Sequence, residues 1–134
     1  TDNDCHVICV AWSESLGKWV WVDPTFAAFV TDENGLMLHP GEVRYRIQHD
    51  LPVVLNKDAN WNNKWPETQD EYIDYYMAKN LYILQTNTFN QAEPEGESTH
   101  RQGHHIALVP QGISYPNSNC NTTDEQWFWQ PPVK

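Results

Sequence analysis

The chain has 134 residues and a mass of 15.6 kDa, which suits one domain around a single hydrophobic core. Eight lysines and arginines against 18 aspartates and glutamates give a formal net charge of −10, which argues against binding to the phosphate backbone of nucleic acid. No apolar run approaches the roughly 20 residues of a transmembrane helix. We therefore expect a folded domain that binds neither nucleic acid nor a membrane.

Two apolar segments near the N-terminus predict a β-hairpin. Residues 5–12, CHVICVAW, and 18–23, KWVWVD, are rich in β-branched and aromatic residues, and SESLG separates them. If Trp12 pairs with Trp19, then His6 and Asp23 are diagonal neighbours on one face, within hydrogen-bond reach of each other. Both faces of the pair are apolar, which is typical of central strands.

The next segments predict a second hairpin and a short helix. Residues 26–31 and 36–38 flank the sequence Asp-Glu-Asn-Gly, in which Asn-Gly is a hairpin turn signal. The stretch GEVRYRIQH, residues 41–49, places apolar residues one helical turn apart. We expect this helix to end before Pro52, because a proline disfavours helical geometry in the residue that precedes it.

The second half of the chain predicts the main helix and further strands. Residues 56–67, NKDANWNNKWPE, have no hydrophobic period and predict an ordered loop held by its tryptophans. Thr68 and Glu71 fit a capping box, and apolar residues at helical spacing then predict a helix at about 69–81. The remaining predicted segments are a polar loop and two strands: 85–103, 105–110 and 125–130. These elements predict an α+β fold with an antiparallel sheet and one main helix.

His6 and Asp23 have the residue types and the spacing of an acid–base pair. A carboxylate holds an imidazole in one tautomer and stabilises the imidazolium that forms when histidine takes up a proton. Pro24 keeps Asp23 extended, which helps to aim its side chain. The spacing alone leaves a purely structural pair open as the alternative.

The segment DCHVICVAWSESLGKWVWVDPTF, residues 4–26, contains a strand with a histidine, then a GKW sequence, then a V-D-P-T sequence. It resembles the His-to-Asp half of the transglutaminase-like superfamily. On this resemblance His6 corresponds to the catalytic base, and Asp23 to the carboxylate that orients the base. The continuation NGLMLHPGEVRYRI, DANWNN and YMAKNLY is similar to the C-terminal part of a group of large bacterial proteins that carry this domain.

The resemblance implies the C-terminal portion of a transglutaminase-like, cysteine-protease-like fold. Residues 1–134 would be a single domain and a fragment of a larger one, with the catalytic-motif hairpin at about 5–30 and the C-terminal helix and strands at about 66–134. The family's nucleophilic cysteine precedes its histidine strand by several tens of residues, so we expect it in an upstream segment of the same polypeptide. The reaction would be acyl transfer or amide hydrolysis through an acyl-enzyme, and this chain alone would be inactive.

The three cysteines are poor candidates for that nucleophile. Cys5 adjoins His6, but adjacent residues of a strand point to opposite faces, so we expect Cys5, and Cys9 with the same parity, to be core residues. They lie about 13 Å apart on an extended strand, too far for a disulfide bond. Cys120 lies in a polar segment, and nothing in the sequence places it near His6.

Tryptophans supply the candidate contacts with a substrate. We expect Trp21 and Trp61 to contact a protein or peptide substrate, because aromatic residues and long ordered loops often do so. The alternative function is a non-catalytic module, a pseudoenzyme that binds a glycan or a peptide within a large secreted bacterial protein. Its binding platform would be formed by four tryptophans: Trp61, Trp65, Trp127 and Trp129.

The sequence predicts no metal site and no cofactor. His100, His104 and His105 form a small cluster, but the stretch between them is unsuited to a rigid element, so we expect solvated histidines before a strand. The expected partners are the substrate, the upstream segment and a second copy of the chain. We expect a secreted, periplasmic or cell-surface location.

Overall fold

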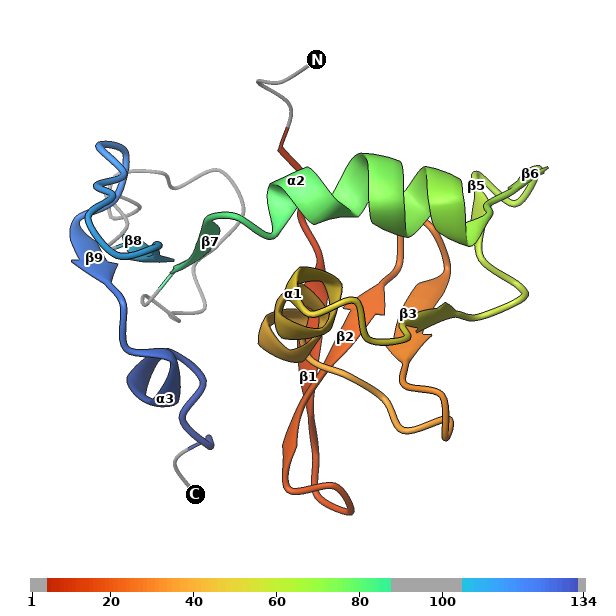
Figure 1. Cartoon of the computed structure of the whole chain (residues 1–134), viewed down its shortest axis with the longest axis horizontal. Coiled ribbons are helices and arrows are strands. Elements are labelled where there is room, and N and C mark those ends of the chain that lie inside the picture. The colour runs from red at the N-terminus through yellow and green to blue at the C-terminus, as the bar shows by residue number, and fades with distance from the viewer. Residues whose placement is uncertain (1–4, 88–104, 133–134) are drawn as a thin grey trace, which may run out of the picture. The chain divides into compact units, whose positions relative to one another are not determined.

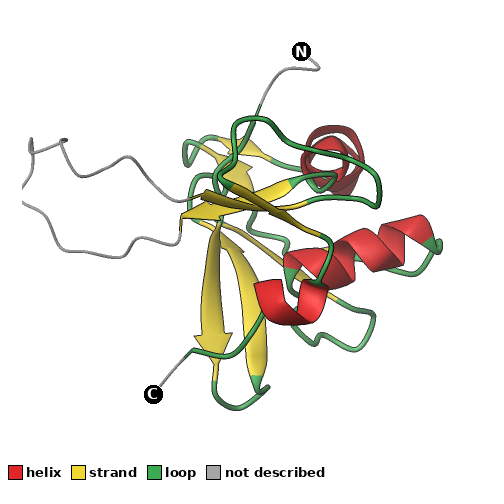
Figure 2. Ribbon diagram, turned by 90° about the vertical axis from the view of Figure 1, so that its left-hand side faces the viewer, coloured by secondary structure: helices red, strands yellow, loops and turns green. Residues whose placement is uncertain are grey.

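The computed structural model describes residues 5–87 and 105–132. The chain divides into two compact units. Unit 1 comprises Thr1–Leu81 and Trp129–Lys134, and unit 2 comprises Tyr82–Phe128. The described residues form a mixed α+β structure with mainly antiparallel sheets and few helices (Figure 2), which confirms the predicted class. That the chain is one domain and part of a larger one stays a prediction.

Unit 1 contains a four-stranded antiparallel sheet with the strand order β1-β2-β3-β4. Figure 1 labels the first three of these strands. The first two strands have the predicted register, with Trp12 opposite Trp19 and Val10 opposite Trp21. The rings of Trp12 and Trp19 meet edge to face, with their centroids 5.5 Å apart. The bounds of the four strands are Cys9–Ser13 (β1), Lys18–Asp23 (β2), Ala28–Thr31 (β3) and Val54–Leu55 (β4).

The first strand differs from its prediction in length and in position. Pairing stops at Cys9 opposite Val22, so residues 5–8 lie outside the ladder. The neighbouring strand β2 ends at Asp23, and the next residue, Pro24, has no N–H to donate to further strand pairing. Within the described sheet β1 is an edge strand rather than a central one, and Val10 is accordingly exposed.

The predicted second hairpin is reduced to one bridge. Thr31, the last residue of β3, forms an isolated bridge with Met37, which belongs to no named strand. The turn between them is held by Asp32, whose Oδ1 accepts hydrogen bonds from the backbone N–H groups of Asn34 at 2.8 Å and Leu36 at 2.9 Å. The bond from Leu36 is the main cause that lowers the pKa of Asp32. The Asp32 side chain therefore stabilises this turn with hydrogen bonds that a longer pair of strands would otherwise supply.

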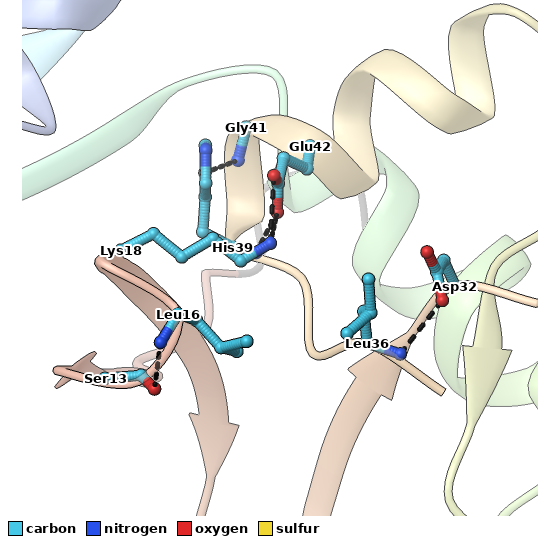
Figure 3. A network of polar contacts seen from close by, with 8 residues as sticks. All are labelled: Ser13, Leu16, Lys18, Asp32, Leu36, His39, Gly41 and Glu42. Carbon is cyan, nitrogen blue, oxygen red and sulfur yellow. Dashed lines mark hydrogen bonds and ion pairs between the residues drawn. The ribbon is translucent and has the colours of Figure 1, made fainter. Parts of the chain in front are cut away.

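Helix α1, Pro40–Gln48, confirms the predicted short helix. His39 precedes it, and His39 Nδ1 accepts a hydrogen bond from Gly41 N at 3.0 Å. Glu42 Oε2 in turn accepts from His39 N at 3.0 Å, which completes a capping box (Figure 3). Lys18 Nζ donates to both oxygens of Glu42, at 2.7 and 3.0 Å, so the same carboxylate also ties α1 to the start of β2.

Part of the predicted loop at 56–67 is a two-stranded ribbon. β5, Asn60–Trp61, pairs with β6, Trp65–Pro66, and Trp61 lies opposite Trp65. Asn62 and Asn63 have positive φ angles of 59° and 56°, as a type I′ hairpin turn requires. Asparagine tolerates this conformation, so an asparagine-rich stretch without hydrophobic period can still form a tight turn.

The main helix lies where the sequence predicts it, as η1, Asp70–Met77, followed without a break by α2, Ala78–Asn80 (Figure 1). The predicted capping box is present: Thr68 Oγ1 accepts from Glu71 N at 3.3 Å, and Glu71 Oε2 accepts from Thr68 N at 3.2 Å. The η1 segment is wound more widely than an α-helix, with the N–H of Ala78 bonded to the carbonyl of Ile73. Its buried face carries Tyr72, Ile73 and Met77.

Unit 2 contains a three-stranded sheet with the order β7-β8-β9, in which β8 pairs antiparallel with β7 and parallel with β9. The strand predicted at 105–110 is observed as β8. The strand predicted at 125–130 is wrong: Glu125–Phe128 form the short helix α3, because Asp124 Oδ1 accepts a hydrogen bond from Trp127 N at 3.0 Å and so caps a helical turn. The strands are Leu84–Asn87 (β7), His105–Leu108 (β8) and Cys120–Thr122 (β9).

The predicted polar loop at 85–103 begins within β7, and its residues from 88 onward lie outside the described part of the chain. Among the described residues, no helix has both the length and the apolar character needed to cross a membrane.

We expect Glu42→Ala to lower the free energy of unfolding by about 1–2 kcal/mol, because α1 loses the Glu42 half of its capping box and Lys18 loses its partner. Glu42→Gln retains a capping oxygen and removes only the charge, and should cost less than about 1 kcal/mol. Urea unfolding measures both values, with Glu14→Gln in the exposed β1–β2 turn as the control. Equal losses for the two Glu42 variants would contradict the capping role.

Candidate active site

The carboxylate of Asp23 is held by the turn that follows β2. Asp23 Oδ1 accepts hydrogen bonds from the backbone N–H groups of Thr25, at 3.0 Å, and Phe26, at 3.4 Å. Pro24 between them fixes its own φ and has no competing N–H. The Asp-Pro-Thr-Phe sequence thus builds a turn that orients its own first side chain.

The other carboxylate oxygen, Oδ2, accepts two side-chain hydrogen bonds. His6 Nε2 lies 2.6 Å from it, and the Tyr72 hydroxyl also lies at 2.6 Å. Asp23 is fully buried, and the His6 side chain is only 10% exposed. A buried carboxylate is costly unless donors surround it. Four donors from three segments of the chain compensate this cost.

The imidazole of His6 is held in a defined orientation. An ionised carboxylate only accepts hydrogen bonds, so His6 Nε2 carries the proton in this pair and Nδ1 is the basic nitrogen. The ring meets the rings of Phe26 and Tyr76 edge to face, with both centroid distances 5.4 Å. Nδ1 makes no hydrogen bond to any described residue. The structure thus brings together His6 and Asp23 as the sequence predicts, and their chemical role stays a prediction.

Aromatic side chains continue from His6 to the ribbon of β5 and β6. Phe26 is buried, and its ring lies 5.0 Å from both Tyr72 and Trp61 and 5.7 Å from Tyr76. Trp61 itself is 41% exposed. This aromatic cluster, comprising Phe26, Trp61, Tyr72 and Tyr76, connects the buried histidine pair with solvent-exposed indole surface.

The two tryptophans predicted to contact substrate have different environments. Trp21 is fully buried, and its ring centroid lies 6.2 Å from that of Tyr72. Its indole N–H has no hydrogen-bond partner among the described residues. Trp21 nevertheless lowers the pKa of Tyr72 somewhat, against the larger rise that burial causes. Trp61 therefore has the exposed ring surface that a substrate contact needs, whereas Trp21 lies inside the core.

The cysteines are not core residues, contrary to the prediction for Cys5 and Cys9. Both are exposed, because β1 is an edge strand in the described sheet and pairing ends at Cys9. Cys9 lies opposite Val22, the residue before Asp23, so its side chain and that of Asp23 are on opposite faces. Cys120 is also exposed and begins β9 of unit 2.

Within residues 5–87 and 105–132, no group of three or more histidine, cysteine, aspartate or glutamate side chains is arranged to hold a metal ion. His100 and His104 lie outside the described residues. His105, the last member of the predicted histidine cluster, begins β8, and its Nδ1 lies 2.6 Å from Gln85 Nε2.

Tyr72 is the site residue that sequence reasoning misses. In the sequence it is one of several apolar positions on the predicted main helix. Its hydroxyl partner lies 49 residues earlier in the chain, and no local pattern connects the two. The available signal was its place near the start of that helix, directly after a capping box.

Comparison of the chain with family models, with curated proteins and with solved structures gives no match.

We predict that Tyr72 makes the stability of the protein sensitive to alkaline pH. Burial, followed by the hydrogen bond to Asp23, raises the pKa of Tyr72 above its ordinary value of 10.0. A raised folded-state pKa contributes stability below the unfolded-state pKa and loses it as the pH rises further. Above about pH 10 the free energy of unfolding should fall by about 1.4 kcal/mol per pH unit through this residue.

Urea unfolding between about pH 8 and pH 11 tests this prediction. Tyr72→Phe should lose this part of the alkaline slope, whereas Tyr75→Phe should behave like the wild type, because Tyr75 is 81% exposed on the same helix. The same slope in all three proteins would show that Tyr72 ionises as freely when folded as when unfolded.

Proposed function

We propose that this chain supplies the histidine and the aspartate of a transglutaminase-like Cys-His-Asp site, which transfers or hydrolyses acyl groups. The observation that carries the proposal is the 2.6 Å hydrogen bond from His6 Nε2 to the fully buried Asp23. It occurs within the segment that resembles the His-to-Asp half of that superfamily. The enclosing transglutaminase-like fold and a secreted, periplasmic or cell-surface bacterial location are proposed on the same resemblance.

The described geometry suits His6 to act first as a base and then as an acid. Nε2 is committed to Asp23, so Nδ1 takes the proton of the nucleophilic thiol, and Asp23 stabilises the imidazolium. The thiolate attacks the carbonyl carbon of an amide, and the imidazolium then gives its proton to the departing amine. The resulting thioester reacts with a second amine, which gives transamidation, or with water, which gives hydrolysis.

The thiol of this mechanism comes from an upstream segment of the same polypeptide. Cys9 is on the sheet face opposite Asp23. Cys5 directly precedes His6 and is exposed, outside the strand pairing that begins at Cys9. Cys120 belongs to the other compact unit. The resemblance to the transglutaminase-like superfamily likewise implies a nucleophile upstream of His6 and outside these three cysteines.

The aromatic cluster gives the site an apolar wall. Phe26 contacts His6 on one side and Trp61 on the other. Trp61 is 41% exposed at the tight turn of the ribbon. A protein or peptide substrate would lay an apolar side chain or its backbone against this ring while its carbonyl group faces His6.

Cysteine reactivity in the full-length protein tests the proposal. Limiting iodoacetamide near neutral pH, followed by mass spectrometry, should identify one rapidly labelled cysteine upstream of the chain described here, since an imidazolium stabilises a thiolate. His6→Gln should slow this labelling by at least about tenfold and lower kcat/KM by about 10²- to 10⁴-fold.

The matched control is His49→Gln, which changes an exposed histidine at the end of α1 and should leave the labelling rate unchanged. Asp23→Asn should act in the same direction as His6→Gln, because the amide no longer holds the productive tautomer. Equal reactivity of all cysteines in the wild type would overturn the proposal.

The second candidate function is a non-catalytic module that binds a glycan or a peptide. It is favoured by one observation: Trp61 and Trp65 lie opposite each other on the ribbon and are 41% and 56% exposed. Exposed paired indoles can stack on the faces of sugar rings. Trp127 is also exposed, but it belongs to the other unit.

Single substitutions of the two ribbon tryptophans distinguish these functions. At an acyl-transfer site, Trp61→Ala should raise KM by about three- to tenfold, in line with the loss of one aromatic contact, and Trp65→Ala should have little effect. At a glycan platform, both should weaken binding of soluble oligosaccharides by similar factors. Calorimetry with hexasaccharides of glucose and N-acetylglucosamine measures the second case, and substrate kinetics measure the first.

A further inference from the structure

We propose that Tyr72 is a positioning residue of this site, and that its hydroxyl controls how strongly Asp23 attracts the proton of His6 by sharing the same carboxylate oxygen. The catalytic consequence rests on the proposed function. The effect on His6 depends only on the described contacts.

The sharing of one oxygen follows from the distances. The Tyr72 hydroxyl and His6 Nε2 each lie 2.6 Å from Asp23 Oδ2, while Oδ1 accepts from the backbone of Thr25 and Phe26. An sp² oxygen offers two lone pairs, so both acceptor positions of Oδ2 are occupied by side chains. The Tyr72 hydroxyl and His6 Nε2 therefore compete as donors for the same carboxylate oxygen, and each weakens the hydrogen bond of the other.

Tyr72 is held where it must act as a donor. It is 1% exposed, and its ring packs against Phe26 at 5.0 Å and against Trp21 at 6.2 Å. Burial raises the pKa of the phenol, and the hydrogen bond to Asp23 raises it further. The hydroxyl thus stays protonated throughout the neutral range.

Competition between Tyr72 and His6 for Asp23 Oδ2 determines in which direction Tyr72 changes the acidity of the His6 imidazolium. A carboxylate that receives a second strong hydrogen bond stabilises a neighbouring imidazolium less than one that receives none. Tyr72 should therefore make the His6 imidazolium a better acid toward the departing amine. The described residues that contact the His6 ring include Asp23 from β2, Phe26 from the following turn and Tyr76 from η1, and of these three only Asp23 has a carboxylate.

Two substitutions at position 72 of the full-length protein change the hydroxyl in opposite directions. Tyr72→Phe removes the donor and keeps the ring. Replacement by 3-fluorotyrosine keeps the hydroxyl and makes it a more acidic, stronger donor. The readout is the pH midpoint of the His6 ring signals in NMR spectra of protein labelled with ¹⁵N-histidine, assigned with His6→Gln.

We expect the midpoint to move to higher pH in Tyr72→Phe and to lower pH in the fluorotyrosine protein. Tyr75→Phe changes an exposed tyrosine of the same helix and should leave the midpoint at its wild-type value. If Tyr72→Phe does not fold, the downward shift in the fluorotyrosine protein tests the proposal alone. An unchanged midpoint in the folded variants would show that Tyr72 only packs the core, and would overturn the proposal.

The outcome is separable from that of the proposed function. If the midpoint moves as expected but no cysteine is activated, then Tyr72 controls a His–Asp pair that is not part of an acyl-transfer site. If one cysteine is activated but the midpoint does not respond to position 72, then the acyl-transfer function stands and the role assigned to Tyr72 fails.

Discussion

The buried carboxylate of Asp23 is the constraint on which the arrangement of unit 1 around His6 depends. A charge removed from water must be matched by donors, and here the donors come from three places in the chain: the segment before β1, the turn after β2, and η1. Each of these segments is thereby held at one point. The cost of burying one charge is offset by contacts that also orient a histidine.

Helices α1 and η1 are each positioned by one side chain that makes two different contacts. Glu42 caps α1 and also pairs with Lys18 at the start of β2 (Figure 3). Tyr72 fills the core beside Trp21 and also donates to Asp23. Since α1 contacts the first residue of β2 and η1 contacts its last residue, the strand that carries the aspartate is held at both ends.

The local elements were largely predictable, because their causes are local. The register of β1 and β2 follows from two apolar runs and a short turn, and the main helix follows from the capping box of Thr68 and Glu71. The helix at Glu125–Phe128 was predicted as part of a strand, since the three consecutive aromatic residues at 127–129 suggested β-structure. The capping residue Asp124 decided the outcome.

The sequence by itself determined the hairpin with its register and the turn that orients the carboxylate. His6 lies before β1, outside the ladder, so its contact with Asp23 does not follow from strand parity. Tertiary structure alone decided that β1 lies at the edge of the described sheet, that Cys9 is exposed, and that Tyr72 reaches Asp23. The physical reason is separation along the chain. Periodicity and turn chemistry act over a few residues, whereas a hydroxyl and a carboxylate 49 residues apart meet only when a helix packs on a sheet.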